Sequence, residues 1–279
     1  MTLSTDSEAA LLAALAWQVE LGVDECISDD PINRFELPKP EPKPAVSPVT
    51  QLGAKPPAAG IAPAVDENAE AVTEAQRLAR EAQTLEALHA AMTGFEGCSL
   101  KRGARNTVFS DGNPAARVMF IGEAPGREED RAGSPFVGRS GQLLDRMLGA
   151  IGLDRRAAEP DKAAYITNVI PWRPVENRDP STDEAAMMWA FLERHIELAA
   201  PEFIVTLGKI SAATLLEKPV AITRARGRWH QPARGGGRPV LLTFHPAYLL
   251  RQPGEKAKSW RDLLSLRATL DGEAPTIEK

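Results

Sequence analysis

The 279-residue sequence contains two cysteines, Cys26 and Cys98, and no apolar run long enough to cross a membrane. Two cysteines do not supply the disulfide framework of a small secreted domain. The first residues also lack the basic, apolar and small-residue order of a signal peptide. We therefore expect a cytoplasmic protein that has no membrane partner.

Two common phosphate-binding motifs are absent as well. Residues 122–126, GEAPG, lack the spacing of a dinucleotide-binding glycine motif, and residues 207–211, LGKIS, have no upstream glycine at the spacing of a P-loop. These absences argue against a kinase or an ATPase.

Charge is distributed unevenly along the chain, whose net charge is −5. Residues 1–95 carry 6 Lys and Arg against 15 Asp and Glu, whereas residues 96–279 carry 27 against 23. A mildly basic C-terminal part permits a polyanionic partner such as DNA. Surface cations on other soluble enzymes give a similar balance, so this support is weak.

The first 71 residues differ in composition from the rest. Within an N-terminal helical segment, residues 1–30, apolar periodicity predicts an amphipathic helix over 9–22. Nine prolines between positions 31 and 63 predict that residues 31–71 form a disordered linker. A docking helix on a tether and a frayed segment fit equally well, so a protein partner for this segment stays open. Residues 72–279 are expected to form one folded domain.

In the folded domain, near-continuous apolar strands alternate with helices, after one long helix over 73–93. The predicted strands are 117–121, 164–170, 203–207 and 239–244, and the predicted helices are 140–151, 182–199, 209–217 and 257–270. This alternation predicts a three-layer α/β/α sandwich with a central, mainly parallel, four-stranded sheet.

Residues suited to binding follow each predicted strand. In chain order these strand ends carry Gly122 with Glu123, Asn168, Gly208 with Lys209, and His245. Ligands of such sheets bind beyond the carboxyl ends of the strands, so we expect these loops to form one site.

Three side chains suit a flat heterocycle. Asn168 can present a donor and an acceptor side by side, as the edge of a nucleobase requires. His245 can donate to an oxygen that gains negative charge, and Phe136 can stack on a base. Each also has a more ordinary interpretation: a turn, a structural histidine or a loop anchor. Their combination carries the hypothesis.

Other positions are candidates for contact with DNA. Glycine-rich loops expose backbone N–H groups, and leucines beside an arginine can wedge into a base stack and contact phosphate. These candidates are Gly138, Ser140, Gly208, Lys209, Leu249, Leu250 and Arg251. The leucines equally suit core packing.

Four motifs resemble the fourth family of uracil-DNA glycosylases, thermophile-type enzymes that usually carry an iron–sulfur cluster. In order they are FIGEAPGREEDRAGSPFVGRSGQLLDRML, YITNVIPWRPVENRDP, LGKISAATLL and FHPAYLLRQP, within residues 90–268. The resemblance implies a DNA repair enzyme, expected to be a monomer, that flips uracil out of DNA. It hydrolyses the N-glycosidic bond and leaves an abasic site.

The resemblance also implies roles for the site residues. By position, the uracil pocket is lined by Gly122, Glu123, Ala124, Phe136 and Asn168, while His245 supports the leaving base. The first glycosylase family has an Asp where this chain has Ala124, so a neighbouring carboxylate must replace it. We predict that Glu129 orients the water and that Glu123 forms the pocket wall.

The chain departs from the family at the cluster. The four cysteine positions correspond to Phe95, Cys98, Trp172 and Met188, and cluster binding needs essentially all four thiolates. We therefore expect an apolar plug, no metal and no cofactor. A related family with a basic, His-containing insertion is excluded, because residues 171–180 are too short to hold it.

Several functions remain open. The retained pocket residues favour a working, cluster-free uracil-DNA glycosylase. The alternatives are a weak or inactive protein that binds uracil or abasic DNA, and a glycosylase with broader specificity for hypoxanthine or xanthine. An unrelated nucleotide-handling enzyme has only the fold in its favour.

Overall fold

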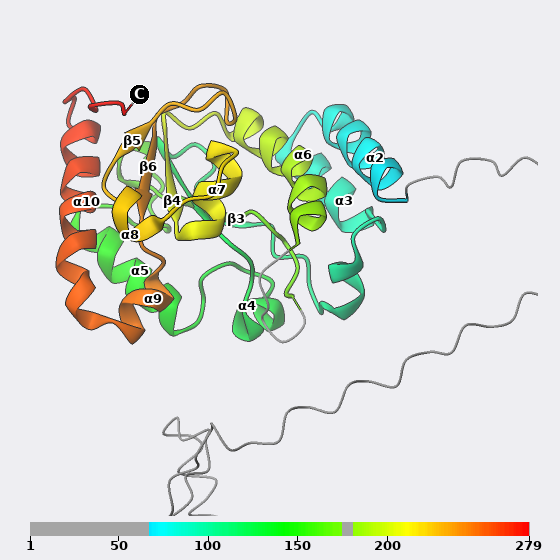
Figure 1. Ribbon diagram of the computed structural model, residues 1–279, viewed down its shortest axis with the longest axis horizontal. Helices are drawn as coiled ribbons and strands as arrows, with labels where there is room; N and C mark the ends of the chain where they lie inside the picture. Colours follow the sequence, from blue (N-terminus) through cyan, green and yellow to red (C-terminus); the bar gives the residue numbers. More distant parts are fainter. Residues whose placement is uncertain (1–66, 175–180, 279) are drawn as a thin grey trace, which may run out of the picture. The chain divides into compact units, whose positions relative to one another are not determined.

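The computed structural model describes residues 67–174 and 181–278. The helix predicted over 9–22 and most of the predicted linker lie outside the described residues. The described part is built around a six-stranded sheet whose strand order is β1-β3-β2-β4-β6-β5 (Figure 1).

The four inner strands of this sheet are parallel, and each edge strand is antiparallel to its neighbour. The strands are β1 (Ser110–Gly112), β2 (Val118–Gly122), β3 (Tyr165–Asn168), β4 (Phe203–Leu207), β5 (Trp229–His230) and β6 (Val240–Thr243). The predicted strands are these parallel inner four, so the prediction of a four-stranded sheet is corrected to six. The edge strands were missed because β1 has 3 residues and β5 has 2, too few for a recognisable pattern.

Strand β2 shows why the inner strands are so apolar. Val118 and Phe120 point into one core, whereas Met119 and Ile121 point into the other. All four side chains are fully buried, and burying each contributes about 1.5–3 kcal/mol to folding. A strand that is covered on both faces therefore has a continuous apolar run.

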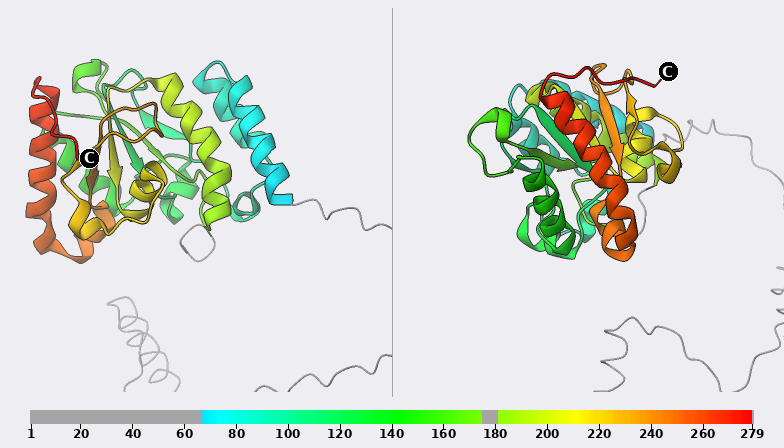
Figure 2. Two further views of the ribbon diagram at one scale, coloured as in Figure 1. Left: turned by 45° about the horizontal axis from the view of Figure 1, so that its top comes forward. Right: turned by 90° about the vertical axis from the view of Figure 1, so that its left-hand side faces the viewer.

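Helices cover both faces of the sheet, as the three-layer prediction requires. On one face lie α5 (Arg139–Ala150) and α10 (Lys256–Leu270), and on the other lie α6 (Thr182–Ala199) and α7 (Lys209–Leu216). Outside α6 pack α2 (Glu67–Glu81) and α3 (Leu85–Gly94), seen beside it in both Figure 1 and Figure 2.

The single long helix predicted over 73–93 is wrong, because the structure has two helices there. Thr84 adopts an extended conformation between them, and its hydroxyl accepts a hydrogen bond from the Ala87 N–H at 3.1 Å. A capping threonine satisfies an amide that the start of a helix otherwise leaves unpaired. The first helix also begins at Glu67, so residues 67–71 are helical and not linker. No proline occurs after Pro63 in this stretch.

Short helices follow two of the inner strands at the carboxyl edge of the sheet. They are α4 (Arg127–Ala132) after β2 and α9 (Pro246–Arg251) after β6, and both lie along the same lower edge in Figure 1. Each has 6 residues, too few to show a helical period in the sequence. These helices carry much of the site described below.

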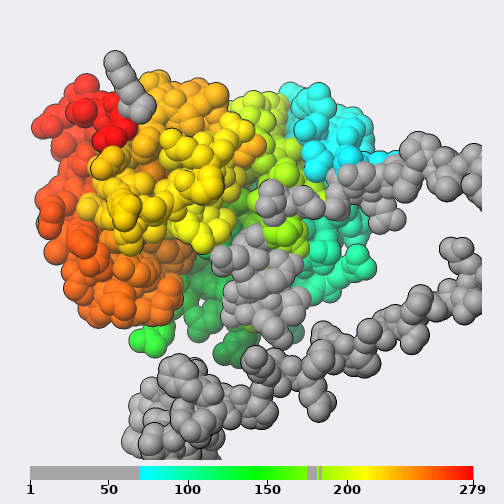
Figure 3. Space-filling view, in the orientation of Figure 1, coloured from blue at the N-terminus to red at the C-terminus, as the bar shows by residue number. Residues whose placement is uncertain are grey.

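A further short helix, α8 (Ile222–Ala225), is joined to the N-terminal half of α10 through the residue that follows it. Arg226 at its end donates to the buried carboxylate of Asp262 at 2.8 Å and to the Lys258 carbonyl at 2.7 Å. The two segments form one continuous surface in Figure 3. Among the described residues, no helix is both long and apolar enough to span a membrane.

Candidate active site

A cavity of about 410 Å³ opens at the carboxyl edge of the sheet. It is lined by Glu123, Ala124, Pro125, Gly126, Glu129, Phe136, Ser140, Asn168, Pro174, His245, Ala247 and Arg251. The lining comes from the segments after β2, β3 and β6. Loops that are more than 100 residues apart in the sequence thus meet at one place, as the strand-end argument predicts.

Asn168 at the end of β3 contributes a buried acceptor. Its side chain is 6% exposed, and its Oδ1 has no hydrogen-bond partner among the described residues. A buried acceptor left unpaired costs about 1–3 kcal/mol, which a ligand that donates a hydrogen bond can recover. Gly122 on β2 makes room for this oxygen, because a Cβ there would lie 2.3 Å from it.

His245 begins α9 and has a defined tautomer. Its Nδ1 accepts the Ala247 N–H at 3.1 Å, so the proton of the neutral ring must lie on Nε2. Burial and, to a smaller extent, the charge of Arg251 lower the pKa of His245 to about 4, against the opposing effect of Glu129. At neutral pH the ring is therefore uncharged, with Nε2–H available as a donor.

Phe136 places an aromatic ring beside this histidine. The two rings stack with centroids 5.4 Å apart and an interplanar angle of 29°. The backbone of Phe136 is left-handed, with φ of 54°, a conformation that costs about 1–2 kcal/mol for a residue other than glycine. A Cβ on Gly122 would lie 2.7 Å from the Phe136 ring, so this glycine gives space to the ring as well.

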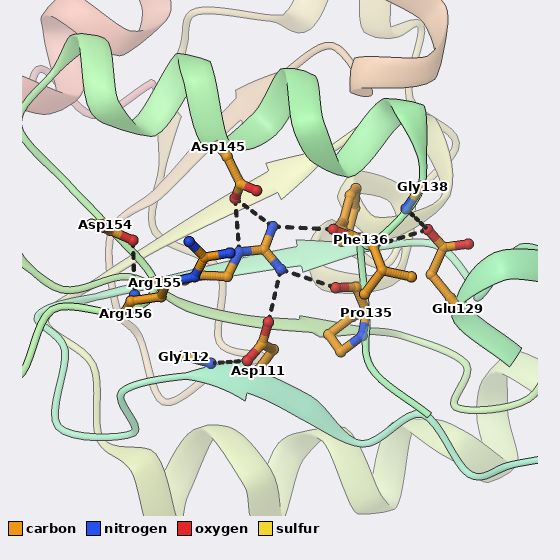
Figure 4. A network of polar contacts seen from close by, with 11 residues as sticks. Asp111, Gly112, Glu129, Pro135, Phe136, Gly138, Asp145, Asp154, Arg155 and Arg156 are labelled. Atoms are coloured by element: carbon orange, nitrogen blue, oxygen red, sulfur yellow. Dashed lines mark hydrogen bonds and ion pairs between the residues drawn. The ribbon is translucent and has the colours of Figure 1, made fainter. Parts of the chain in front are cut away.

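Glu129 joins the two glycine-rich loops. Its Oε2 accepts the Gly126 N–H at 3.1 Å. Its Oε1 accepts the N–H groups of Val137 and Gly138, also at 3.1 Å each (Figure 4). The side chain is 8% exposed yet lines the cavity. A carboxylate has about four acceptor sites, so three backbone donors fix its position and leave one site on Oε2. In the sequence, glycine-rich loops on both sides of an acidic residue indicate that backbone N–H groups can bind its carboxylate.

A second hollow of about 550 Å³ shares Glu129, Ser140 and Ala247 with the cavity. Gly138 and Leu250, both predicted to contact DNA, also line it. Three arginines that were not predicted from the sequence, Arg127, Arg139 and Arg173, line it together with Glu128. Their position beside the cavity suits the phosphates that flank a bound base.

Three predicted site residues lie elsewhere. Leu249 is 1% exposed and packs with Leu143 and Phe244, so the prediction that it contacts DNA is wrong. Gly208 is buried below the cavity, where a Cβ would lie 3.1 Å from the Cβ of His245, and Lys209 is exposed at the start of α7. Neither lines either hollow. The adjacent residues Leu249 and Leu250 lie on different sides of α9, and the sequence of so short a helix does not tell which of them faces the core.

Arg155, which lies in the loop after α5, was not predicted from the sequence. This arginine is 8% exposed and donates to the backbone carbonyls of Pro135 and Phe136 (Figure 4). Its position in an Arg-Arg pair far along the chain from Phe136 carries no signal of this contact.

Comparison with known proteins agrees with this site. The model of the Uracil DNA glycosylase superfamily matches residues 109–264, which include the residues that line both hollows. The chain therefore belongs to the uracil DNA glycosylase superfamily.

Several curated relatives of the chain are named type-4 uracil-DNA glycosylases. The chain is 41% identical over 158 residues to that of Thermotoga maritima, covering 55% of this chain and 77% of the relative. It is 35% identical over 185 residues to that of Archaeoglobus fulgidus (64% and 90%), and 35% over 192 residues to that of Sulfurisphaera tokodaii (66% and 84%). Within the superfamily the chain groups with type 4.

The residues at the four cluster positions do not fit a four-thiolate cluster. Phe95, Cys98, Trp172 and Met188 are 3%, 1%, 1% and 1% exposed and belong to one apolar core. Only one of them offers a thiolate. Among the described residues, no group of three or more His, Cys, Asp or Glu is placed to hold a metal ion. We call these four residues the apolar plug.

Proposed function

We propose that the protein flips uracil out of DNA, hydrolyses its N-glycosidic bond and leaves an abasic site, without an iron–sulfur cluster. The observation that carries this proposal is the pair of opposite hydrogen-bonding groups in one cavity. Asn168 supplies a buried acceptor with no partner, and His245 supplies an Nε2–H donor. The names of the relatives point to the same base.

Asn168 supports the recognition of uracil over cytosine. Its Oδ1 would accept the N3–H of uracil, and its amide N–H would donate to O4. Cytosine has an acceptor at N3 and a donor at C4, so both contacts would be opposed, at a cost of about 1–3 kcal/mol. The Phe136 ring, which lines the same cavity, would stack on the base.

His245 would assist departure of the base. As the bond between C1′ and N1 breaks, its electron pair moves onto uracil and charge develops on the O2 oxygen. The neutral ring donates to this oxygen through Nε2, in a geometry set in advance by the Ala247 N–H. One such donor typically accelerates a reaction about 10²–10³-fold.

Glu129 would orient the attacking water. The water oxygen bonds to C1′ of the oxocarbenium-like sugar, and its proton leaves toward the carboxylate. Three backbone donors hold Glu129 in place, and its remaining acceptor site suits one water O–H. Glu123 lines the cavity from the tip of β2 and would form its wall.

The cluster-free form of the proposal is supported by the apolar plug. Three of the four cluster positions hold apolar side chains, all four are buried, and Phe95 packs on Phe191 with ring centroids 5.5 Å apart. That the protein acts as a monomer stays a prediction. The cytoplasmic location and a partner for residues 1–30 stay predictions.

The direct test is incubation with an oligonucleotide that contains one uracil, followed by alkaline cleavage at abasic sites. We expect cleavage at uracil, none at cytosine, and much less with the Asn168→Ala variant. Parallel oligonucleotides with hypoxanthine or xanthine measure how broad the specificity is. Tight binding of abasic DNA by a wild-type protein that never cleaves would instead establish a binding protein without turnover.

A further inference from the structure

We propose that Arg155 is a positioning residue, which holds Phe136 in the left-handed conformation that presents its ring to the flipped base. The inference rests on the proposed function, because it takes the ring to be the surface on which uracil stacks.

All three nitrogens of the Arg155 guanidinium are engaged within this network (Figure 4). Nη1 donates to the Pro135 carbonyl at 3.1 Å and to Asp111 at 2.8 Å, and Nη2 donates to the Phe136 carbonyl at 3.2 Å. Nε and Nη2 both reach Oδ1 of Asp145 at 2.7 Å. The arginine thus ties the loop to β1 through Asp111 and to α5 through Asp145.

The Phe136 backbone is held from two sides. Arg155 binds its carbonyl from one side, and α5 packs against the same group so closely that a Cβ on Gly141 would lie 1.7 Å from the oxygen. Phenylalanine does not prefer a φ of 54°. Two neighbouring carbonyls bound to one rigid guanidinium oppose rotation of Phe136 toward an extended conformation, which would move the ring away from the cavity.

The position of the ring follows from that of the backbone. The Phe136 ring stacks on His245 and lies against Gly122, so little space remains for another rotamer. A simple ion pair would need only the two carboxylates. The two carbonyl contacts are what connect Arg155 to the cavity, and a lysine cannot reproduce the fixed fork that makes them.

Arg155→Lys is the test, because it keeps the charge and removes the fork. Base stacking contributes in both the substrate complex and the transition state, so its loss raises KM more than it lowers kcat. We expect KM for a uracil oligonucleotide and Kd for free uracil to rise about tenfold, within the range of base–aromatic stacking. In a Phe136→Ala background the same change should have no further effect on either.

Arg117 offers a matched control at the opposite end of β2. Like Arg155 it pairs with two carboxylates, Glu202 at 2.8 and 2.9 Å and Asp161 at 3.6 Å, and it donates to one backbone carbonyl, that of Leu270, at 3.0 Å. Arg117→Lys should lower thermal stability while KM and the Kd for uracil stay at wild-type values. This control separates a loss of stability from a loss of ring position.

An unchanged KM and uracil Kd in Arg155→Lys would overturn the inference, and so would an effect that persists in full in the Phe136→Ala background. If Arg155→Lys does not fold, Asp145→Asn loosens the same arginine, and a smaller rise that vanishes with Phe136→Ala supports the inference. An unchanged KM in Asp145→Asn then overturns it. Failure of the proposed function is distinct, because it shows in the wild-type protein as absence of uracil release.

Discussion

The cavity at the carboxyl edge of the sheet and the apolar plug use burial in opposite ways. In the cavity, buried polar atoms face space that a ligand can fill, as the unpaired Oδ1 of Asn168 does. In the plug, buried side chains pack within one apolar core, and the polar Nε1 of Trp172 is paired, donating to Thr107 at 3.1 Å. The difference teaches that cavity substitutions should change reaction rates, whereas plug substitutions should change stability.

The largest effect on stability is expected from Phe95→Ala in the plug. Removing a buried aromatic ring leaves a cavity and lowers the free energy of unfolding by about 3–5 kcal/mol. Well below the unfolding temperature, the single-turnover rate of uracil release should stay near the wild-type value. Leu264→Ala on α10, where the side chain is 45% exposed, is the control and should cost far less. An unfolding free energy equal to wild type in Phe95→Ala would show that the plug does not bear on stability.

His245→Ala in the cavity should show the converse. We expect the single-turnover rate to fall about 10²–10³-fold, because one donor to the leaving oxygen is lost. Binding of abasic product should change little, since that contact strengthens only as charge develops. His230→Ala on β5 is the control for loss of a histidine outside the cavity. A wild-type rate in His245→Ala would show that other donors stabilise the negative charge on the leaving base.

The four inner strands were predictable from the sequence because each is a nearly continuous apolar run. Asn168 and His245 were predicted because they follow such strands, and Phe136 because it is a lone aromatic in a glycine-rich loop; the structure brings all three to one cavity. What the sequence could not reveal depends on approach in three dimensions. The contact between the Arg155 guanidinium and the Phe136 carbonyl forms only when the backbone of Phe136 is left-handed. The burial of Leu249 depends on which side of a six-residue helix faces the core.

The pH dependence sharpens the comparison further, because the two regions hold different buried histidines. The pKa of His245 is lowered to about 4, so the rate of uracil release should stay level from pH 8 to about 5 and fall as the ring protonates near 4.

His195, which stacks on Phe109 beside the plug, has a pKa lowered to about 3, mainly by burial. A lowered folded-state pKa contributes stability that is complete above the ordinary histidine value of 6.5 and is lost as the pH falls through the folded value. His195→Gln should therefore flatten the loss of unfolding free energy between pH 6.5 and 3 without moving the rate profile. A rate profile that shifts with His195→Gln would contradict this separation.

The smallest effect is expected from Cys98→Ala. In the plug this cysteine is a small buried side chain, so its loss should cost about 1 kcal/mol of unfolding free energy. The uracil-release rate and the metal content should match those of the wild type. A large loss of activity together with loss of bound iron would mean that Cys98 is a ligand.

The most direct measurement combines iron analysis with single-turnover uracil release on the same purified wild-type protein, before and after dialysis against a chelator. We predict iron far below one atom per chain and a rate of uracil release that the chelator does not change. Stoichiometric iron that the chelator removes together with the activity would contradict the cluster-free mechanism and the apolar plug.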